Sequence, residues 1–138
     1  AGLARGGDGA LPAALTRPER YFAGGSFSGV LSMHGWNANP DDPRMTEFSM
    51  LFGDLSQLSG SNHDPSTWII NNVKNSISYP ELYISCGLQD ELLPTNRYFI
   101  NTCKSQGVKV EYQEEEGIHD WFFWDKQILK FLAFALDH

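Results

Sequence analysis

Basic residues are few in this chain of 138 residues. Ten lysines and arginines stand against 17 aspartates and glutamates, so the net charge at pH 7 is -7. A protein that binds nucleic acid through a basic face needs clustered lysine and arginine to neutralise the phosphates. Here the basic residues are scattered along the sequence, which excludes a nucleic-acid partner of that kind.

Long apolar runs are missing as well. A helix that spans a membrane needs about 20 consecutive apolar residues, and no stretch of the sequence approaches that length. Residues 1–12 also lack the apolar centre of a secretory signal peptide. We therefore expect no membrane partner and favour a cytoplasmic location.

Cysteines and clustered metal ligands are equally sparse. Cys86 ends an apolar strand-like run and Cys103 lies in a helical pattern, so we expect two reduced core residues rather than a bridge. His34 and His63 lie in polar loops without a second ligand at the spacing of a zinc site. The sequence therefore predicts no bound metal.

What the chain does have is the apolar content of one folded domain. Hydrophobic residues make up 41% of the sequence and aromatic residues 13%, so we expect a single domain over residues 1–138. Short apolar or alternating segments, each bounded by glycine or proline, predict three strands: Tyr21–Ser28, Leu82–Cys86 and Val108–Tyr112.

Helical patterns lie before, between and after these strands, at Leu11–Leu15, Thr95–Gln106 and Trp121–Leu136. In the last of them, apolar residues at three- and four-residue spacing predict one buried face: Trp121, Trp124, Ile128, Leu132 and Ala135. Helices that alternate with strands predict the α/β class, with a parallel sheet of about three strands and crossover helices in three layers.

Residues 31–78 interrupt this alternation. The segment is rich in asparagine, aspartate, proline, serine and glycine, and it contains short helical patterns near Thr46–Phe52 and Pro65–Asn75. A long excursion between two strands often shapes a substrate pocket or forms a lid. It can equally pack over the edge of the sheet.

Three motifs in a fixed order indicate hydrolytic chemistry. The opening Gly2-Leu3-Ala4-Arg5-Gly6 has the glycine spacing of the nucleophile elbow G-x-S-x-G, with alanine in place of serine. Asp90 follows the strand Leu82–Cys86, and His119 follows the strand Val108–Tyr112. An acid and then a histidine, in loops after later strands, complete a nucleophile–acid–histidine triad.

These motifs resemble the esterase D and tributyrin-esterase-like group of α/β-hydrolases. The similar segments are the elbow Gly2–Leu11 (usually G-L-S-M-G-G-x-G-A), the acid segment Leu82–Asp90, and the histidine segment Glu116–Asp125 (G-x-H-x-W-x-x-W). The resemblance covers essentially the whole chain and implies part of an α/β-hydrolase fold. It also implies a Ser-His-Asp mechanism on short acyl or aryl esters, with no metal or organic cofactor.

The resemblance assigns roles residue by residue. Ala4 stands at the nucleophile position, Asp90 is the acid, His119 is the base, and the backbone N–H of Arg5 belongs to the oxyanion hole. Trp121 is either a core residue or part of the pocket. Because Ala4 has no hydroxyl, an acyl-enzyme cannot form there, and we expect this chain to be catalytically inactive.

The elbow departs from the family pattern in other ways. Arg5 and Asp8 put charge where the family has an apolar or aromatic residue, and Pro12 falls inside the helix that the elbow normally begins. An interior proline costs about 3 kcal/mol. We therefore expect the helix to begin near Leu11 or Pro12 and the elbow remnant, residues 1–11, to be unwound.

By the family order, the three strands are the last three of eight, and Tyr21–Ser28 has a free edge. We expect self-association through this strand to give a homodimer, with a separate N-terminal half that completes the domain as the alternative. Two functional classes stay open: an esterase by family, or a non-catalytic half-domain that acts as a folding and assembly unit. A flavodoxin-like ligand binder would rest on sheet topology alone.

Overall fold

A parallel β-sheet forms the centre of the computed structural model, which describes residues 2–3, 5–29, 31, 50, 64–75, 78 and 80–137. Its strand order, β1-β2-β3-β4, follows the chain, and each neighbouring pair is parallel. The strands are β1 (Gly2–Leu3), β2 (Ala23–Phe27), β3 (Glu81–Gly87) and β4 (Val110–Glu115).

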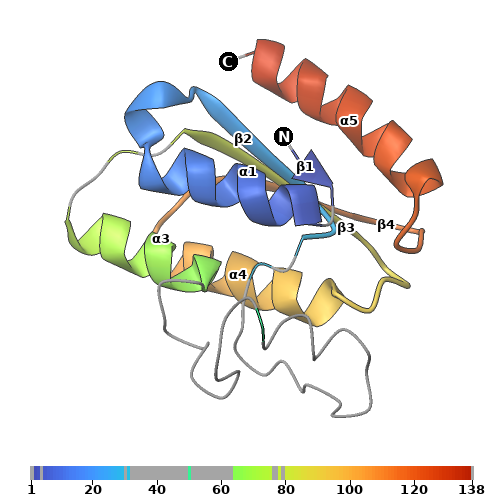
Figure 1. Ribbon diagram of the computed structural model, residues 1–138, viewed down its shortest axis with the longest axis horizontal. Coiled ribbons are helices and arrows are strands. Elements are labelled where there is room, and N and C mark those ends of the chain that lie inside the picture. Colours follow the sequence, from blue (N-terminus) through green and yellow to red (C-terminus); the bar gives the residue numbers. More distant parts are fainter. Residues whose placement is uncertain are drawn as a thin grey trace.

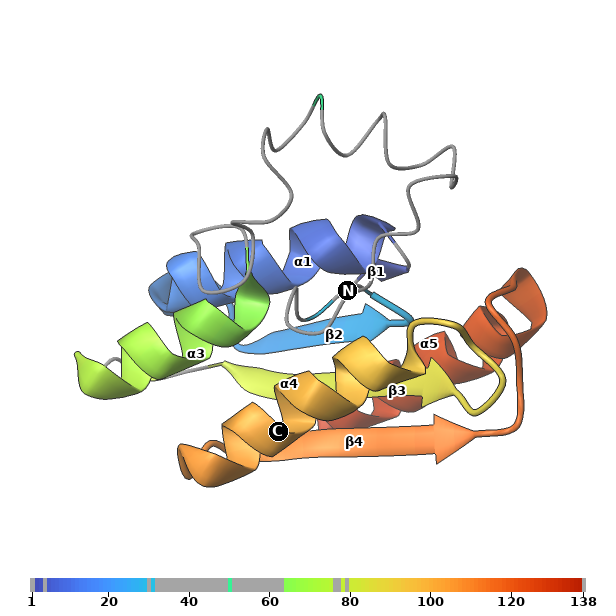
Figure 2. The same cartoon turned by 90° about the horizontal axis from the view of Figure 1, so that it is seen from below.

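Helices cover both faces of this sheet. Figures 1 and 2 show α1, α3 and α4 on one face and α5 alone on the other. The helices are α1 (Arg5–Thr16), α3 (Pro65–Lys74), α4 (Leu93–Ser105) and α5 (Trp121–Leu136), with a 3-10 turn at Pro18–Arg20. The predicted α/β class and its three layers are confirmed.

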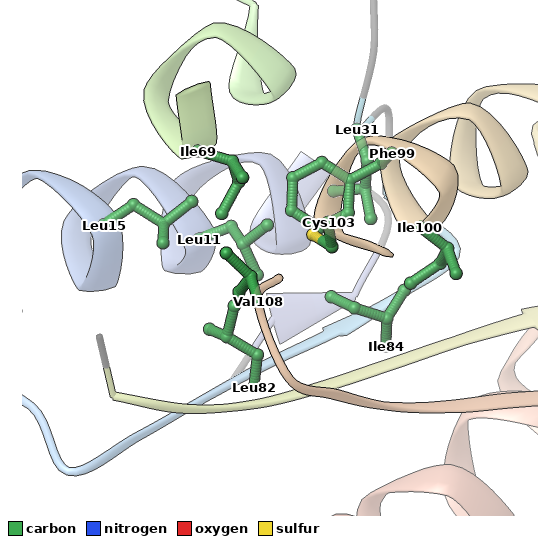
Figure 3. Close-up of a cluster of buried hydrophobic side chains, with 10 residues drawn as sticks. All are labelled: Leu11, Leu15, Leu31, Ile69, Leu82, Ile84, Phe99, Ile100, Cys103 and Val108. Carbon is green, nitrogen blue, oxygen red and sulfur yellow. The ribbon is translucent and has the colours of Figure 1, made fainter. Parts of the chain in front are cut away.

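The alternation of β3 divides the interior into two cores. Leu82 and Ile84 point toward α1, α3 and α4, where they pack with buried residues of those helices such as Leu11 and Phe99 (Figure 3). Tyr83 points to the opposite face and packs with Phe27 of β2 and the buried side of α5. Successive side chains of a strand point to opposite faces, so a strand that is buried along nearly its whole length suits a sheet that is covered on both sides.

All three predicted strands are present, and β1 adds a fourth that the sequence analysis missed. Gly2 pairs with Ser26 and Leu3 with Phe27, so the free edge expected for Tyr21–Ser28 is occupied at its carboxyl end. A strand of two residues carries no periodic pattern, which is why only tertiary pairing identifies it.

The expected start of the first helix is wrong. α1 begins at Arg5 rather than near Leu11, so the segment after β1 is helical and not unwound, and Pro12 lies inside the helix. Leu11 and Leu15 are fully buried against the sheet and α3. Each buried leucine is worth about 1.5–3 kcal/mol, and together they offset the roughly 3 kcal/mol that an interior proline costs.

The last helix has the predicted bounds but not the predicted buried face. Trp121, Ile128 and Leu132 are exposed, whereas Trp124 and Ala135 are buried as expected. The remaining buried positions are Phe123, Gln127 and Phe131. Gln127 is buried because its Oε1 accepts a hydrogen bond from the hydroxyl of Tyr83 at 2.8 Å. Since α5 is apolar nearly all round, spacing alone could not decide which side meets the sheet.

Most of the excursion at residues 31–78 lies outside the described residues. Within it, the helical pattern at Pro65–Asn75 is confirmed by α3, whose N-cap Asp64 accepts a hydrogen bond from the backbone N–H of Ser66. Cys86 and Cys103 are both buried and free, as predicted. Among the helices that the structure describes, none is both long and apolar enough to cross a membrane.

We predict that Gly25→Ala destabilises the fold by about 1–3 kcal/mol, the usual cost of overpacking a filled core. A Cβ on Gly25 would lie 2.7 Å from Cδ2 of Phe131, whose ring packs against Phe27 and Tyr83. Urea denaturation measures the loss. The control is the double variant Gly25→Ala, Phe131→Leu, which should lose less than the sum of the single variants; additive losses would contradict the close contact.

Candidate active site

The loops after β3 and β4 meet at the carboxyl edge of the sheet, and each supplies one functional side chain. Asp90 comes from the turn after β3, and its side chain is fully buried. Its Oδ1 accepts a hydrogen bond from the backbone N–H of Leu92 at 2.8 Å. One carboxylate oxygen is thereby fixed, and the other is left to face the loop after β4.

That second oxygen contacts His119. The distance between Asp90 Oδ2 and His119 Nδ1 is 2.9 Å, and the imidazole is 34% exposed. A carboxylate can only accept a hydrogen bond, so the Nδ1–H of His119 is the donor to Asp90. In the neutral imidazole with this tautomer, Nε2 carries no hydrogen and can accept a proton, as a general base must.

Two backbone contacts hold the loops at this spacing. The side-chain Oε1 of Gln89 accepts from the N–H of Gly117 at 2.8 Å, and the N–H of Gln89 donates to the carbonyl of Gly117 at 3.1 Å. Gly87 must be glycine because a Cβ there would lie 2.2 Å from the same carbonyl oxygen. The close approach of the two loops therefore depends on residues outside the Asp–His pair.

The predicted elbow lies at the same edge. β1 runs parallel to the other strands and ends at Leu3, and α1 begins at Arg5, so the strand passes into the helix with one residue between them. That residue, Ala4, lies outside the described residues. The backbone N–H of Arg5 is among the first N–H groups of a helix, which have no intrahelical acceptor.

Cys86 does not take the place of the absent serine. It is fully buried at the end of β3. Burial and, second, the negative charge of Asp90 raise the pKa of its thiol to about 12. Since the thiolate is the nucleophilic form, Cys86 is inert at neutral pH.

No metal site accompanies the Asp–His pair among the residues that the structure describes. In the described part of the chain, no group of three or more histidine, cysteine, aspartate or glutamate residues could hold a metal ion. His34 and His63, which we expect not to bind a metal, lie outside the described residues. A hollow of about 520 Å³ lies behind the histidine loop, lined in part by Gln89 and Lys126, but neither Asp90 nor His119 lines it.

Trp121 and Trp124 occupy different environments beside the site. Trp121, the candidate pocket residue, is 68% exposed, and its role in a pocket stays a prediction. Trp124 is buried, and its ring lies edge-to-face against the imidazole of His119 with centroids 4.9 Å apart. The sequence placed Trp124 in the core but gave no sign of this contact.

A strained residue was also missed. Ser28, just after β2, has a left-handed backbone (φ 58°) and is fully buried, and its N–H donates to the carbonyl of Ser85 at 2.8 Å. Backbone strain of this kind is concentrated at functional sites. A serine after a strand carries no signal from which this conformation could be predicted.

The fold and the site together define a class of protein. A parallel sheet with helices on both faces, a strand-to-helix turn, and then an acid and a histidine after later strands constitute the arrangement of an α/β-hydrolase domain. The sequence matches the Esterase family model over residues 1–135. The chain therefore belongs to the Esterase family, as the motifs predicted.

The chain is also similar to individual esterases and hydrolases. The chain is 35% identical over 132 residues to an acetyl esterase of Caldicellulosiruptor saccharolyticus, covering 92% of this chain and 50% of that protein. The structure of an S-formylglutathione hydrolase of Staphylococcus aureus matches with a TM-score of 0.81 at 27% identity. The match covers 97% of this chain and 52% of the hydrolase chain. The structure of the fluorophosphonate-binding serine hydrolase F of Staphylococcus aureus matches with a TM-score of 0.80 at 27% identity. This match covers 97% of this chain and 52% of the serine hydrolase chain. The chain thus spans about half the length of these relatives.

At the end of β4, an ion pair predicts a dependence of stability on pH. Arg97 donates from Nε and Nη2 to the two carboxylate oxygens of Glu114 at 2.7 and 2.9 Å, and the Tyr112 hydroxyl donates at 2.6 Å. The hydrogen bonds from Arg97 and then from Tyr112 lower the pKa of Glu114 from 4.5 to about 2.

A carboxyl whose pKa is lowered by folding stabilises the folded state above its unfolded pKa and loses that contribution as the pH falls. The free energy of unfolding should therefore decrease between pH 4.5 and about 2, as measured by urea denaturation at a series of pH values. Glu114→Gln should flatten this part of the profile, whereas the exposed Glu116→Gln should not. An unchanged slope in Glu114→Gln would show that the pair contributes nothing.

Proposed function

We propose that this chain carries the acid–base part of a carboxylic ester hydrolase that acts on short acyl or aryl esters by a Ser-His-Asp mechanism. The 2.9 Å contact between Asp90 Oδ2 and His119 Nδ1 at the carboxyl edge of the sheet carries the proposal. The name of the acetyl esterase relative supports an acyl ester as substrate. Since the chain spans half the length of its relatives, the remainder of the pocket would come from the other half.

In this mechanism His119 first accepts a proton and later gives it up. Nε2 takes the proton of a hydroxyl while the hydroxyl oxygen attacks the ester carbonyl, and the Asp90 carboxylate stabilises the imidazolium that forms. The same proton then goes to the leaving alcohol as the C–O bond breaks. Water repeats the attack on the acyl-enzyme and releases the acid. The N–H of Arg5 would donate to the oxyanion that forms at each attack.

The residue at position 4 decides whether this chain can carry out the first step. A serine there would provide the attacking hydroxyl, and alanine provides none. We therefore propose that the chain as it stands does not hydrolyse esters through an acyl-enzyme, although its acid and base are in place.

The test is hydrolysis of p-nitrophenyl acetate by the chain and by its Ala4→Ser variant. We predict turnover only in the variant, because it alone has a nucleophile. In the Ala4→Ser background, His119→Gln should reduce the rate by at least about 100-fold, the lower range for losing a general base. Circular dichroism checks that each protein is folded.

Each other outcome overturns a part of the proposal. Equal rates with and without the serine would show that position 4 is not the nucleophile position. A folded Ala4→Ser variant without turnover would favour the second candidate function, a non-catalytic half-domain that serves folding and assembly.

One observation favours this second function. The outer side of α5 exposes a strip of large apolar residues: Trp121, Phe122, Ile128, Leu129, Leu132 and Leu136. Lys130 on another side of the helix pairs with Glu115 of β4. Each residue of a helix is turned by 100° from the one before it, so the strip lies on a different side of α5 from Lys130. The strip therefore faces outward and away from β4, toward the edge of the sheet that β1 forms. The exposed Asp125 lies within this strip, but exposed apolar side chains that gather in this way commonly mark an association surface.

We predict that the chain forms a homodimer through this strip. Sedimentation equilibrium should give twice the monomer mass, and the double variant Leu129→Lys, Leu132→Lys should give the monomer mass because charge on the strip prevents its burial. The control is Lys104→Glu, an exposed change on α4 that should leave the dimer intact. A wild-type chain that remains monomeric at all concentrations would contradict the prediction.

A further inference from the structure

Two described residues contact the imidazole of His119, each in a different way. Asp90 accepts a hydrogen bond at Nδ1, and Trp124 packs against the ring at 87° with centroids 4.9 Å apart. A single hydrogen bond fixes one ring atom but lets the ring turn about the bond, and the imidazole is 34% exposed. The second contact is therefore the one that can fix the plane of the ring.

Trp124 is itself held rigidly. Its side chain is buried in the core between α5 and the sheet, with Phe27 and Phe131 as members of the same cluster. On its outer side Trp121 packs against it at 81° with centroids 5.4 Å apart. Side chains in such a close-packed interior have little freedom to change rotamer, so Trp124 is a fixed wall for the imidazole.

We propose that Trp124 is a positioning residue, which holds the His119 ring in the plane where Nδ1 faces Asp90 and Nε2 stays bare. The inference rests on the proposed function, in which His119 is the base. Trp124 does not touch the reacting atoms; it acts through the imidazole. Edge-to-face packing of this kind is a preferred geometry for two aromatic rings.

The indole N–H plays no part in this role. Trp124 Nε1 is buried and has no hydrogen-bond partner among the described residues. What holds the imidazole is thus the aromatic ring and not a hydrogen bond. A phenyl ring at position 124 should keep the effect, and an aliphatic side chain should lose it.

The experiment compares Trp124→Leu and Trp124→Phe with Phe131→Leu, a control in the same buried cluster. Long-range ¹⁵N–¹H spectra of the histidine rings, at a pH well above the ordinary imidazole pKa of about 6.5, report the tautomer, and a His119→Asn variant assigns the signals. We expect a single Nδ1–H tautomer for His119 in the wild-type chain, in Trp124→Phe and in Phe131→Leu. In Trp124→Leu we expect the averaged signals of two tautomers.

Activity in the Ala4→Ser background gives a second readout. Trp124→Leu should lower kcat up to about tenfold with KM little changed, and Trp124→Phe should restore most of it. A single tautomer in a folded Trp124→Leu variant would overturn the proposal, because Trp124 would then be only a core residue. The proposal would also be overturned if Phe131→Leu altered the tautomer of His119 as much as Trp124→Leu does, at an equal loss of stability.

The two proposals fail separately. The tautomer is measured without turnover, so the expected spectra in a chain whose Ala4→Ser variant is inactive would support the positioning role and count against ester hydrolysis. If Trp124→Phe behaves like Trp124→Leu, the effect belongs to the indole N–H, and positioning by the ring is overturned.

Discussion

The rest of the structure depends on the pairing of β3 with β2 on one side and β4 on the other. β3 is paired on both edges, and helices cover both faces of the sheet at this strand. Its alternating side chains are therefore buried on both faces, and two cores form around Ile84 and Tyr83. The same pairing aligns the carboxyl ends of β3 and β4, so the loops that follow them begin side by side. The position of Asp90 next to His119 is a consequence of that alignment.

Alignment alone would leave the two side chains loosely placed. The exchange of hydrogen bonds between Gln89 and Gly117, which is possible only because Gly87 has no side chain, brings the loops into contact. The N–H of Leu92 then fixes one oxygen of Asp90, and the aromatic wall of Trp124 lies against the imidazole. Asp90 and His119 are thus each held by a further group that would take no part in the reaction. Under the proposed function, in which His119 is the base, these contacts preorganise it.

Membership of the Esterase family and the residue at position 4 lead to different expectations. Asp90 and His119 are in hydrogen-bond contact, and a strand-to-helix turn precedes α1, which begins at Arg5, where the family pattern predicts these features. Position 4 is alanine and provides no hydroxyl. Under the proposed function, the side chain at position 4 decides whether the domain hydrolyses esters, and the apolar strip on α5 is its proposed surface for association.

The sequence by itself determined the class of fold, three of the strands and the bounds of α5, because glycine and proline boundaries are local features. Its ordered motifs also predicted Asp90 and His119 as the acid and the base. It could not place β1, which has no periodicity in two residues, nor the start of α1, where buried leucines outweigh an interior proline. The buried face predicted for α5 from the sequence was wrong, because a helix that is apolar nearly all round can bury either side. Only the tertiary structure decided which ring meets His119 and which loop contacts hold Asp90, because these depend on packing between segments distant in the chain.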